Sequence, residues 1–213
     1  VNDQLVSVVD IGSETVEEYE LGAQDIVGPA GSALVMIAPR PDGGRAVLVH
    51  GPSGDVIDTD SFAPVVGPRY DFAESRATAS GREVLVTDSG NFQSVLFSFD
   101  RDKTSFFPGL ALAVNSDLVV PAQNVGSDAT ISVFDHGGEL IATGRTPSVR
   151  AGMIAASGIV LVTVEGDVLV MSASDGEVSE AGRVDVGTVE SGDVTTRGDR
   201  LLVTGGSGTA IID

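Results

Sequence analysis

The stretch VVDIGSETV at residues 8–16 decides the fold, because the chain repeats its pattern. Apolar residues of high β-propensity lead to a polar position, a short turn follows, and a further strand begins. Related stretches occur at residues 48–56 (LVHGPSGDV), 97–104 (FSFDRDKT), 133–140 (VFDHGGEL), 170–178 (VMSASDGEV) and 211–213 (IID). The polar positions in these copies are Asp10, His50, Asp100, Asp135, Ser172 and Asp213.

The copies follow one another at a spacing close to 40 residues. The successive intervals between the polar positions are 40, 50, 35, 37 and 41 residues. Such a period with several short strands in each unit is typical of propeller blades. We therefore predict an all-β propeller of four-stranded antiparallel blades, with a single domain or propeller segment over residues 1–213. The copies amount to about five blades' worth, in a closed five-bladed ring or in part of a six- to eight-bladed one.

One unit, residues 148–186, shows the expected order of strands. We expect strands at residues 152–156, 159–163, 167–171 and 178–184, with Asp-Gly in the last hairpin turn. The second of these strands is almost wholly apolar, as expected where neighbours cover both faces. First strands in other units, at residues 77–79, 110–114 and 194–196, contain small residues that suit the crowded axis of a propeller. No segment has a helical period with caps, so we expect no α-helix.

Residues 6–16 (VSVVDIGSETV), with an apolar-Gly step at Leu21-Gly22, resemble a YVTN-type repeat. Residues 130–135 and 209–213 are similar. In a looser form the resemblance extends to PQQ-like and WD40-like repeats and covers almost the whole chain. It implies a β-propeller, a fold that in bacteria and archaea is often extracytoplasmic, and it implies no particular chemistry.

The charge of the chain limits its partners. Thirty-one acidic residues face twelve basic ones, for a formal net charge of −19. Nucleic acids and anionic lipids are bound by clustered Lys and Arg, so we expect neither as a partner. An acidic surface suits an extracytoplasmic location, and we expect a secreted, periplasmic or cell-surface protein. No apolar run approaches the roughly 18 residues that span a bilayer, so we expect no direct insertion in a membrane. Because residue 1 is Val rather than Met, we expect a processed product or a piece of a longer cell-envelope protein.

The sequence offers little to catalysis. It has no Cys, hence no disulfide, thiolate ligand or Cys nucleophile. Its two histidines, His50 and His136, fall in units that are not adjacent, whereas zinc needs three or four converging ligands. The stretch GGSG at residues 205–208 lacks the Lys and the helix of a phosphate loop and predicts a hairpin turn. Without Trp there is little to stack on a sugar or a quinone. We expect a non-catalytic protein without a cofactor.

An alternative function uses acidic residues near the first strands. Asp25, Glu74 and Asp193 lie just before those strands, so a metal-handling (Ca or Zn) or hydrolytic propeller is the second hypothesis. Paired carboxylates at Asp58/Asp60 and Asp100/Asp102 lack the remainder of a calcium loop and are more typical of turns.

The longest interval contains the candidate binding site. Its extra residues fall at 64–76 (PVVGPRYDFAESR), which we expect to connect a fourth strand to the next first strand, on the face where propellers bind ligands. We predict that Arg69, Tyr70, Asp71 and Arg76 bind another protein, because Arg and Tyr are frequent anchors and the two arginines form a cationic patch on an acidic molecule. The Arg69 and Tyr70 side chains should lie outside the blade core. Whether a small molecule also binds is left open.

Overall fold

The structure is a computed structural model, and it describes residues 4–10, 14–21, 26–30, 33–38, 45–50, 57–58, 70–78, 82–101, 103–155, 158–184, 187, 194–197, 200–206 and 208–212. Over these ranges the backbone forms β-strands and one 3-10 turn, η1 (Phe99–Arg101), without an α-helix. The all-β prediction is confirmed. In the same ranges no helix is long and apolar enough to cross a membrane.

Four units contain four antiparallel strands each, and in every unit the order in the sheet follows the order in the chain. They are β3 (Ile26–Ala30), β4 (Ala33–Ala38), β5 (Arg45–His50) and β6 (Ile57–Asp58); β7 (Tyr70–Ala77), β8 (Glu83–Asp88), β9 (Gln93–Ser98) and β10 (Lys103–Pro108); β11 (Leu110–Val114), β12 (Leu118–Val125), β13 (Asp128–Asp135) and β14 (Leu140–Pro147); β15 (Val149–Ala155), β16 (Gly158–Thr163), β17 (Val168–Ser174) and β18 (Glu177–Val184). A hairpin of β1 (Gln4–Asp10) and β2 (Thr15–Leu21) precedes them. A sheet of β19 (Val194–Arg197), β20 (Arg200–Gly205) and β21 (Gly208–Ile212) follows.

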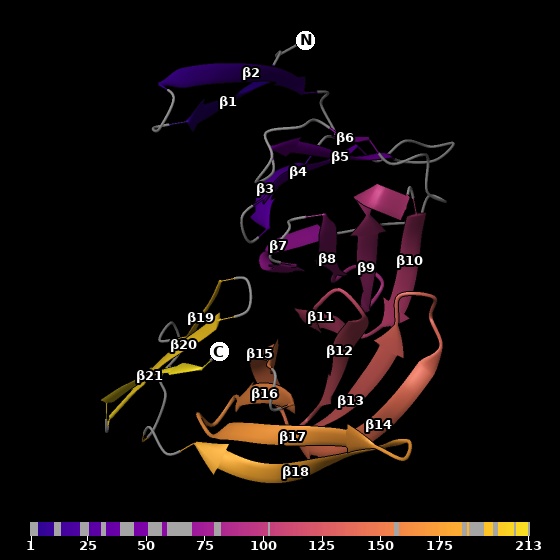
Figure 1. Cartoon of the computed structure of the whole chain (residues 1–213), viewed down its shortest axis with the longest axis vertical. Coiled ribbons are helices and arrows are strands. Elements are labelled where there is room, and N and C mark those ends of the chain that lie inside the picture. Colours follow the sequence, from indigo (N-terminus) through magenta and orange to yellow (C-terminus); the bar gives the residue numbers. More distant parts are fainter. Residues whose placement is uncertain are drawn as a thin grey trace.

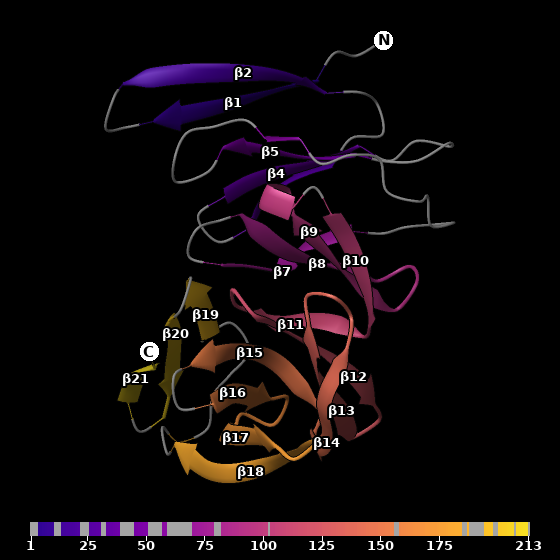
Figure 2. The ribbon, with the colours of Figure 1, turned by 45° about the vertical axis from the view of Figure 1, so that its right-hand side comes forward.

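The units are arranged as propeller blades. Their first strands, β3, β7, β11, β15 and β19, contact one another in turn, so they form the inner side of the arrangement. Figures 1 and 2 show the sheets following one another along an arc, from the indigo β1–β2 hairpin to the yellow β19–β21 sheet beside β15. The order predicted from the repeat is confirmed, and the number of blades stays open.

The hydrophobic core lies between the blades. Every residue of β8 is buried, and β16 is buried from its second residue onward, because these apolar second strands have neighbours on both faces. The innermost β11 has the sequence LALAV, whose small Ala residues fit where blades converge. The outermost β18 is mostly exposed. Burial therefore changes from the inner to the outer strand of a blade as the sequence predicts.

The polar position of the repeated phrase closes a turn. Asp135 Oδ1 accepts a hydrogen bond of 2.8 Å from the backbone N–H of Glu139, and the backbone N–H of Gly138 donates to Asp135 O at 3.1 Å. The Glu139 N–H, with smaller contributions from Gly137 and Gly138, lowers the pKa of the Asp135 carboxyl. At this position the repeat encodes a hairpin rather than a ligand site.

Two predicted hairpins are confirmed. Asp175 and Gly176 join β17 to β18 with φ values of 52° and 82°, and two successive positive φ angles fit the twist of a two-residue turn. Gly205 pairs with Gly208 across the β20–β21 turn, so the GGSG stretch lies between two strands. Its phosphate-loop interpretation is thereby excluded on topology, since no helix follows it.

Candidate binding site between two blades

Tyr70, Asp71 and Arg76 do not lie in a connecting loop, and for these three residues the expectation is corrected. Tyr70, Asp71 and Arg76 belong to β7, the innermost strand of its blade, which begins well before the predicted strand at residues 77–79. The pairing passes from Asp71↔Thr87 to Arg76↔Leu85, so residues 72–75 bulge out of the ladder. The bulge breaks the alternation by which a strand is recognised. Arg69 lies outside the described residues.

Arg76 joins two blades. Its side chain is partly buried, and its Nε donates a hydrogen bond of 3.0 Å to the carbonyl oxygen of Leu112 in β11. The expectation that the Arg69 and Tyr70 side chains lie outside the blade core falls on side chains that the structure does not describe. The register places Tyr70 opposite Asp88, at the end of the blade where β8 turns into β9. The binding role predicted for Arg69, Tyr70, Asp71 and Arg76 stays a prediction.

The acidic alternative is not assembled in the part of the chain that is described. Asp25 and Asp193 fall outside that part, and Glu74 is described only through its place in β7. Among the described residues, no group of three or more His, Cys, Asp or Glu could hold a metal ion. The metal-handling or hydrolytic function stays a hypothesis.

A pocket of about 590 Å³ opens between the β7–β10 and β11–β14 blades. The β8–β9 turn, the β10–β11 turn and the end of β12 form it. Its lining residues are Ser89, Phe92, Gly109, Leu110, Ala122, Gln123, Asn124 and Val125. The lining contains no Asp, Glu, His, Lys, Arg or Cys, so its polar groups are hydroxyl, amide and backbone groups. Its chemistry is that of an apolar binding site with a few polar groups.

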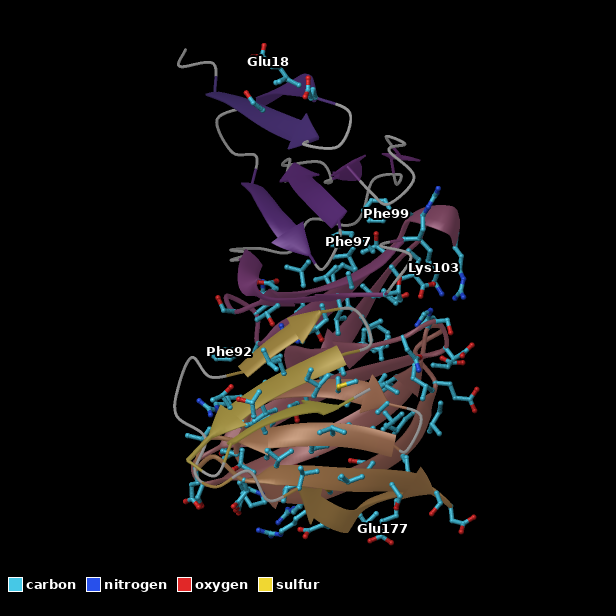
Figure 3. The ribbon with its side chains drawn as sticks, turned by 60° about the vertical axis from the view of Figure 1, so that its left-hand side comes forward. Glu18, Phe92, Phe97, Phe99, Lys103 and Glu177 are labelled. Atoms are coloured by element: carbon cyan, nitrogen blue, oxygen red, sulfur yellow. The ribbon has the colours of Figure 1, made fainter. Side chains whose placement is uncertain are left out.

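Phe92 is the most exposed large side chain of the pocket. It is 78% exposed and ends the four-residue turn between β8 and β9 with a φ of +53°, a conformation that favours Gly or Asn. Asp88 organises this turn, because its carboxylate accepts hydrogen bonds from Gly90 N at 3.2 Å and Asn91 Nδ2 at 2.8 Å. Figure 3 shows Phe92 at the margin of the ribbon, apart from Phe97 and Phe99 at the other end of β9. An exposed aromatic held in an unfavourable conformation points to a role outside folding.

The facing wall of the pocket is fixed by the next blade. The Asn124 amide donates from Nδ2 to Val149 O at 2.8 Å, and Asn124 Oδ1 accepts from Val149 N at 3.0 Å. Ser148 Oγ donates to Gly126 O at 2.8 Å and approaches Asp128 O at 3.1 Å. These contacts hold the end of β12 and its turn, while Val125 remains 76% exposed. The wall is therefore rigid before any ligand arrives.

A polar cluster holds the opposite end of the same two blades. His136 Nδ1 lies 3.1 Å from Glu83 Oε1, and its Nε2 lies 3.0 Å from the carbonyl oxygen of Asn115. The side chain of His136 is only 3% exposed. Arg101, on η1, approaches Glu83 Oε1 at 3.5 Å from the solvent side. His136 therefore has a structural role at this end of the junction, and His50 lies in β5, two blades away.

The sequence prediction missed the pocket because three distant segments form it. One local signal was present: Phe92 is a large apolar residue within the otherwise polar stretch DSGNFQ at residues 88–93. In a chain with eight Phe and no Trp, an aromatic residue in a turn is a sign of an exposed contact.

Comparisons with known proteins agree with this architecture. No family model matches the chain, and no curated protein matches its sequence. Among solved structures, Hsv2 from Kluyvelomyces marxianus is similar with a TM-score of 0.52 at 14% identity, over 95% of this chain and 69% of that one. A chain in the crystal structure of the mitotic checkpoint complex gives a TM-score of 0.51 at 10% identity, over 99% and 81%. Both are propeller-like, and at these identities the likeness shows the fold alone: this chain has the fold of a β-propeller.

Proposed function

We propose that this protein is a non-catalytic binding propeller that holds another protein at the face carrying the pocket between the β7–β10 and β11–β14 blades. The observation that carries the proposal is the composition of that pocket. It exposes Phe92 on the β8–β9 turn and Val125 at the end of β12, and its lining contains no charged or imidazole side chain. Exposed apolar residues on a rigid scaffold are a common basis of protein recognition.

The residues predicted from the sequence extend the same face. Tyr70 is paired with Asp88, the residue immediately before the turn that carries Phe92, so the start of β7 and the pocket share one end of the blade. In this proposal Arg69 and Tyr70 contact the same partner. Arg76 also contacts the next blade at Leu112.

We further propose that the protein acts outside the cytoplasm, as a YVTN- or PQQ-like propeller segment of a cell-envelope protein. The repeat phrase and the net charge of −19 support this. Protease treatment of intact source cells tests it, since an extracytoplasmic propeller would be cleaved or released and a cytoplasmic one would be protected.

The binding function is tested by recovering partners from source cells with purified variants. The Phe92→Ser, Val125→Ser double variant should lose the partner, because both exposed apolar contacts are removed. Its matched control is Leu140→Ser, Ile141→Ser, which changes two exposed apolar residues of β14. The Arg69→Ala, Tyr70→Ala variant should weaken recovery by about a hundredfold or more if both anchors are desolvated. Equal recovery by wild type and the Phe92, Val125 variant would show that the pocket is not the binding site.

A further inference from the structure

One edge of β12 is open at the pocket. The pairing of β12 with β11 ends at Leu110↔Ala122, whereas its pairing with β13 continues to Val125↔Asp128. β12 therefore extends three residues, 123–125, beyond its last partner on the β11 side. The chain that enters β11 turns away at Gly109, whose backbone N–H donates to Phe92 O at 3.0 Å. Gly109 lies directly against Ala122 and Gln123, and beyond it no described strand continues β11 along this edge.

The open edge adjoins the apolar part of the pocket. Val119 contacts the core toward the β7–β10 blade and Val120 the core toward the β15–β18 blade. By the two-residue alternation of a strand, Gln123 and Val125 face the β7–β10 blade, from which Phe92 projects. Val125 and Phe92 both line the pocket, with Leu110 from the start of β11. A ligand along the β12 edge would have an apolar recess beside it.

The edge is already in the conformation of a paired strand. Both polar atoms of the Asn124 amide are bonded to Val149, and Ser148 holds the turn after β12. Adding a strand there orders little of the protein, so most of the interaction energy would remain available for affinity. The Gln123 side chain is exposed and lies in the lining, where its amide can pair with a peptide group.

The charge of the protein selects among peptides. None of the pocket's lining residues is charged, while the whole chain has a formal net charge of −19. An acidic segment would be repelled during approach, and a basic one would be attracted. The recess itself accepts an uncharged apolar side chain.

We propose that this site binds an extended peptide segment of the partner, which adds as a short strand to the edge of β12 at residues 123–125. One apolar side chain of the segment enters the recess between Phe92 and Val125, and Lys or Arg residues flank it. This inference rests on the proposed function and names the chemistry of its partner. Backbone hydrogen bonds supply affinity, and the recess selects the side chain.

The test uses a phage-displayed library of random nine-residue peptides against the purified full chain. Selection on wild type, with the Phe92→Ser, Val125→Ser variant as counter-selection, should enrich peptides with an apolar residue between basic ones. Enriched peptides should bind the double variant at least tenfold more weakly than wild type or the Leu140→Ser, Ile141→Ser control. Methylation of a backbone nitrogen next to the apolar residue should abolish binding, because the added strand loses a donor. Far-ultraviolet circular dichroism and melting temperature confirm that each variant is folded.

The outcomes separate this inference from the function on which it rests. Three results would each overturn the peptide-strand site. The selection could enrich no peptide that prefers wild type to the double variant, it could enrich acidic peptides, or the selected peptides could bind equally well after backbone methylation. If in that case the cellular partner is still lost from the Phe92, Val125 variant, the binding function stands. Selected peptides that meet all three expectations support the site even if no cellular partner depends on it, and only the proposed function then fails.

Discussion

Two junctions between blades have the same strand order and are closed in different ways. Between β7–β10 and β11–β14, a buried Glu83–His136 contact holds one end, the Phe107 and Phe134 rings meet at 5.3 Å in the core, and the other end opens as the pocket. Between β11–β14 and β15–β18 lies a large cluster of buried apolar residues. At its outer edge β14 pairs with β18 at Thr143↔Glu177, which makes one eight-stranded sheet of two blades.

The difference indicates where a propeller of this kind can place a binding site. A junction whose outer strands are hydrogen-bonded is closed along that edge, and we expect it to contribute mainly to stability. Where polar groups hold one end of a junction, the other end does not have to be closed and can form a pocket. In this molecule the first junction carries the pocket, and the second supplies the rigid support for its wall through Asn124 and Ser148.

The closed junction should be the most sensitive to added volume. A Cβ atom on Gly144 would overlap the carbonyl oxygen of Val178 in β18, so Gly144→Val must push the two outer strands apart. We expect a loss of about 3 kcal/mol in the free energy of unfolding and a fall in melting temperature of roughly 6–12 °C, measured by calorimetry. The matched control is Gly182→Val in β18, where a Cβ atom would meet nothing within 4 Å, and it should melt like wild type. If both variants have the same melting temperature, the contact between β14 and β18 contributes nothing to stability.

The polar end of the first junction should be the next most sensitive. His136→Ala removes the imidazole between the Glu83 carboxylate and the Asn115 carbonyl and should lower the unfolding free energy by about 2 kcal/mol. Arg101→Ala should cost roughly 0.5 kcal/mol or less, since the Arg101 side chain is 53% exposed. Urea unfolding measures both. Equal losses would mean that burial does not distinguish the two partners of Glu83.

A substitution at the open end of the first junction should raise the free energy of unfolding instead of lowering it. Phe92→Gly replaces a residue at φ +53° by one that adopts this angle freely, and it removes no buried side chain. We expect a gain of up to about 1 kcal/mol in unfolding free energy together with loss of partner binding, measured by urea unfolding and partner recovery. A destabilised Phe92→Gly protein would instead show that the aromatic ring supports the turn.

The smallest effect concerns the turn after β13 and depends on pH. The Glu139 N–H lowers the pKa of Asp135 from its usual 3.8, so the folded state favours the charged carboxylate. The stability that this supplies is fully present above the unfolded value and is lost as pH falls through the lowered folded value. Between about pH 6 and about pH 3, Asp135→Asn should therefore lose less stability than wild type in urea unfolding. If wild type and Asp135→Asn lost stability in parallel, the hydrogen bonds to Asp135 would not favour its charged carboxylate.

Much of the fold follows from local chemistry in the sequence. The Asp175-Gly176 turn is encoded by two residues that tolerate positive φ, and the buried second strands are encoded by continuous apolar runs. The start of β7 could not be predicted in the same way. Its ladder is interrupted by the bulge at residues 72–75, so no period of two runs through it.

The pocket could be predicted even less, because it depends on how two blades meet. Phe92 and Val125 are far apart in the sequence and come together only when β8–β9 and β12 are placed side by side. The role of Arg76 was hidden for the same reason. A local pattern cannot show that its partner is a backbone carbonyl of the following blade, at Leu112.

The single pairing between β14 and β18 has a consequence for local unfolding. Because Thr143 N–H donates to Gly176 O at 3.1 Å across the two blades, opening either outer strand disturbs the hydrogen-bond ladder of the other. The two blades should therefore exchange their amide hydrogens as one cooperative unit, while the β7–β10 blade exchanges independently. The β11–β14 and β15–β18 blades, which form and support one wall of the pocket, would thus fluctuate together. The β8–β9 turn that carries Phe92 would fluctuate separately from them.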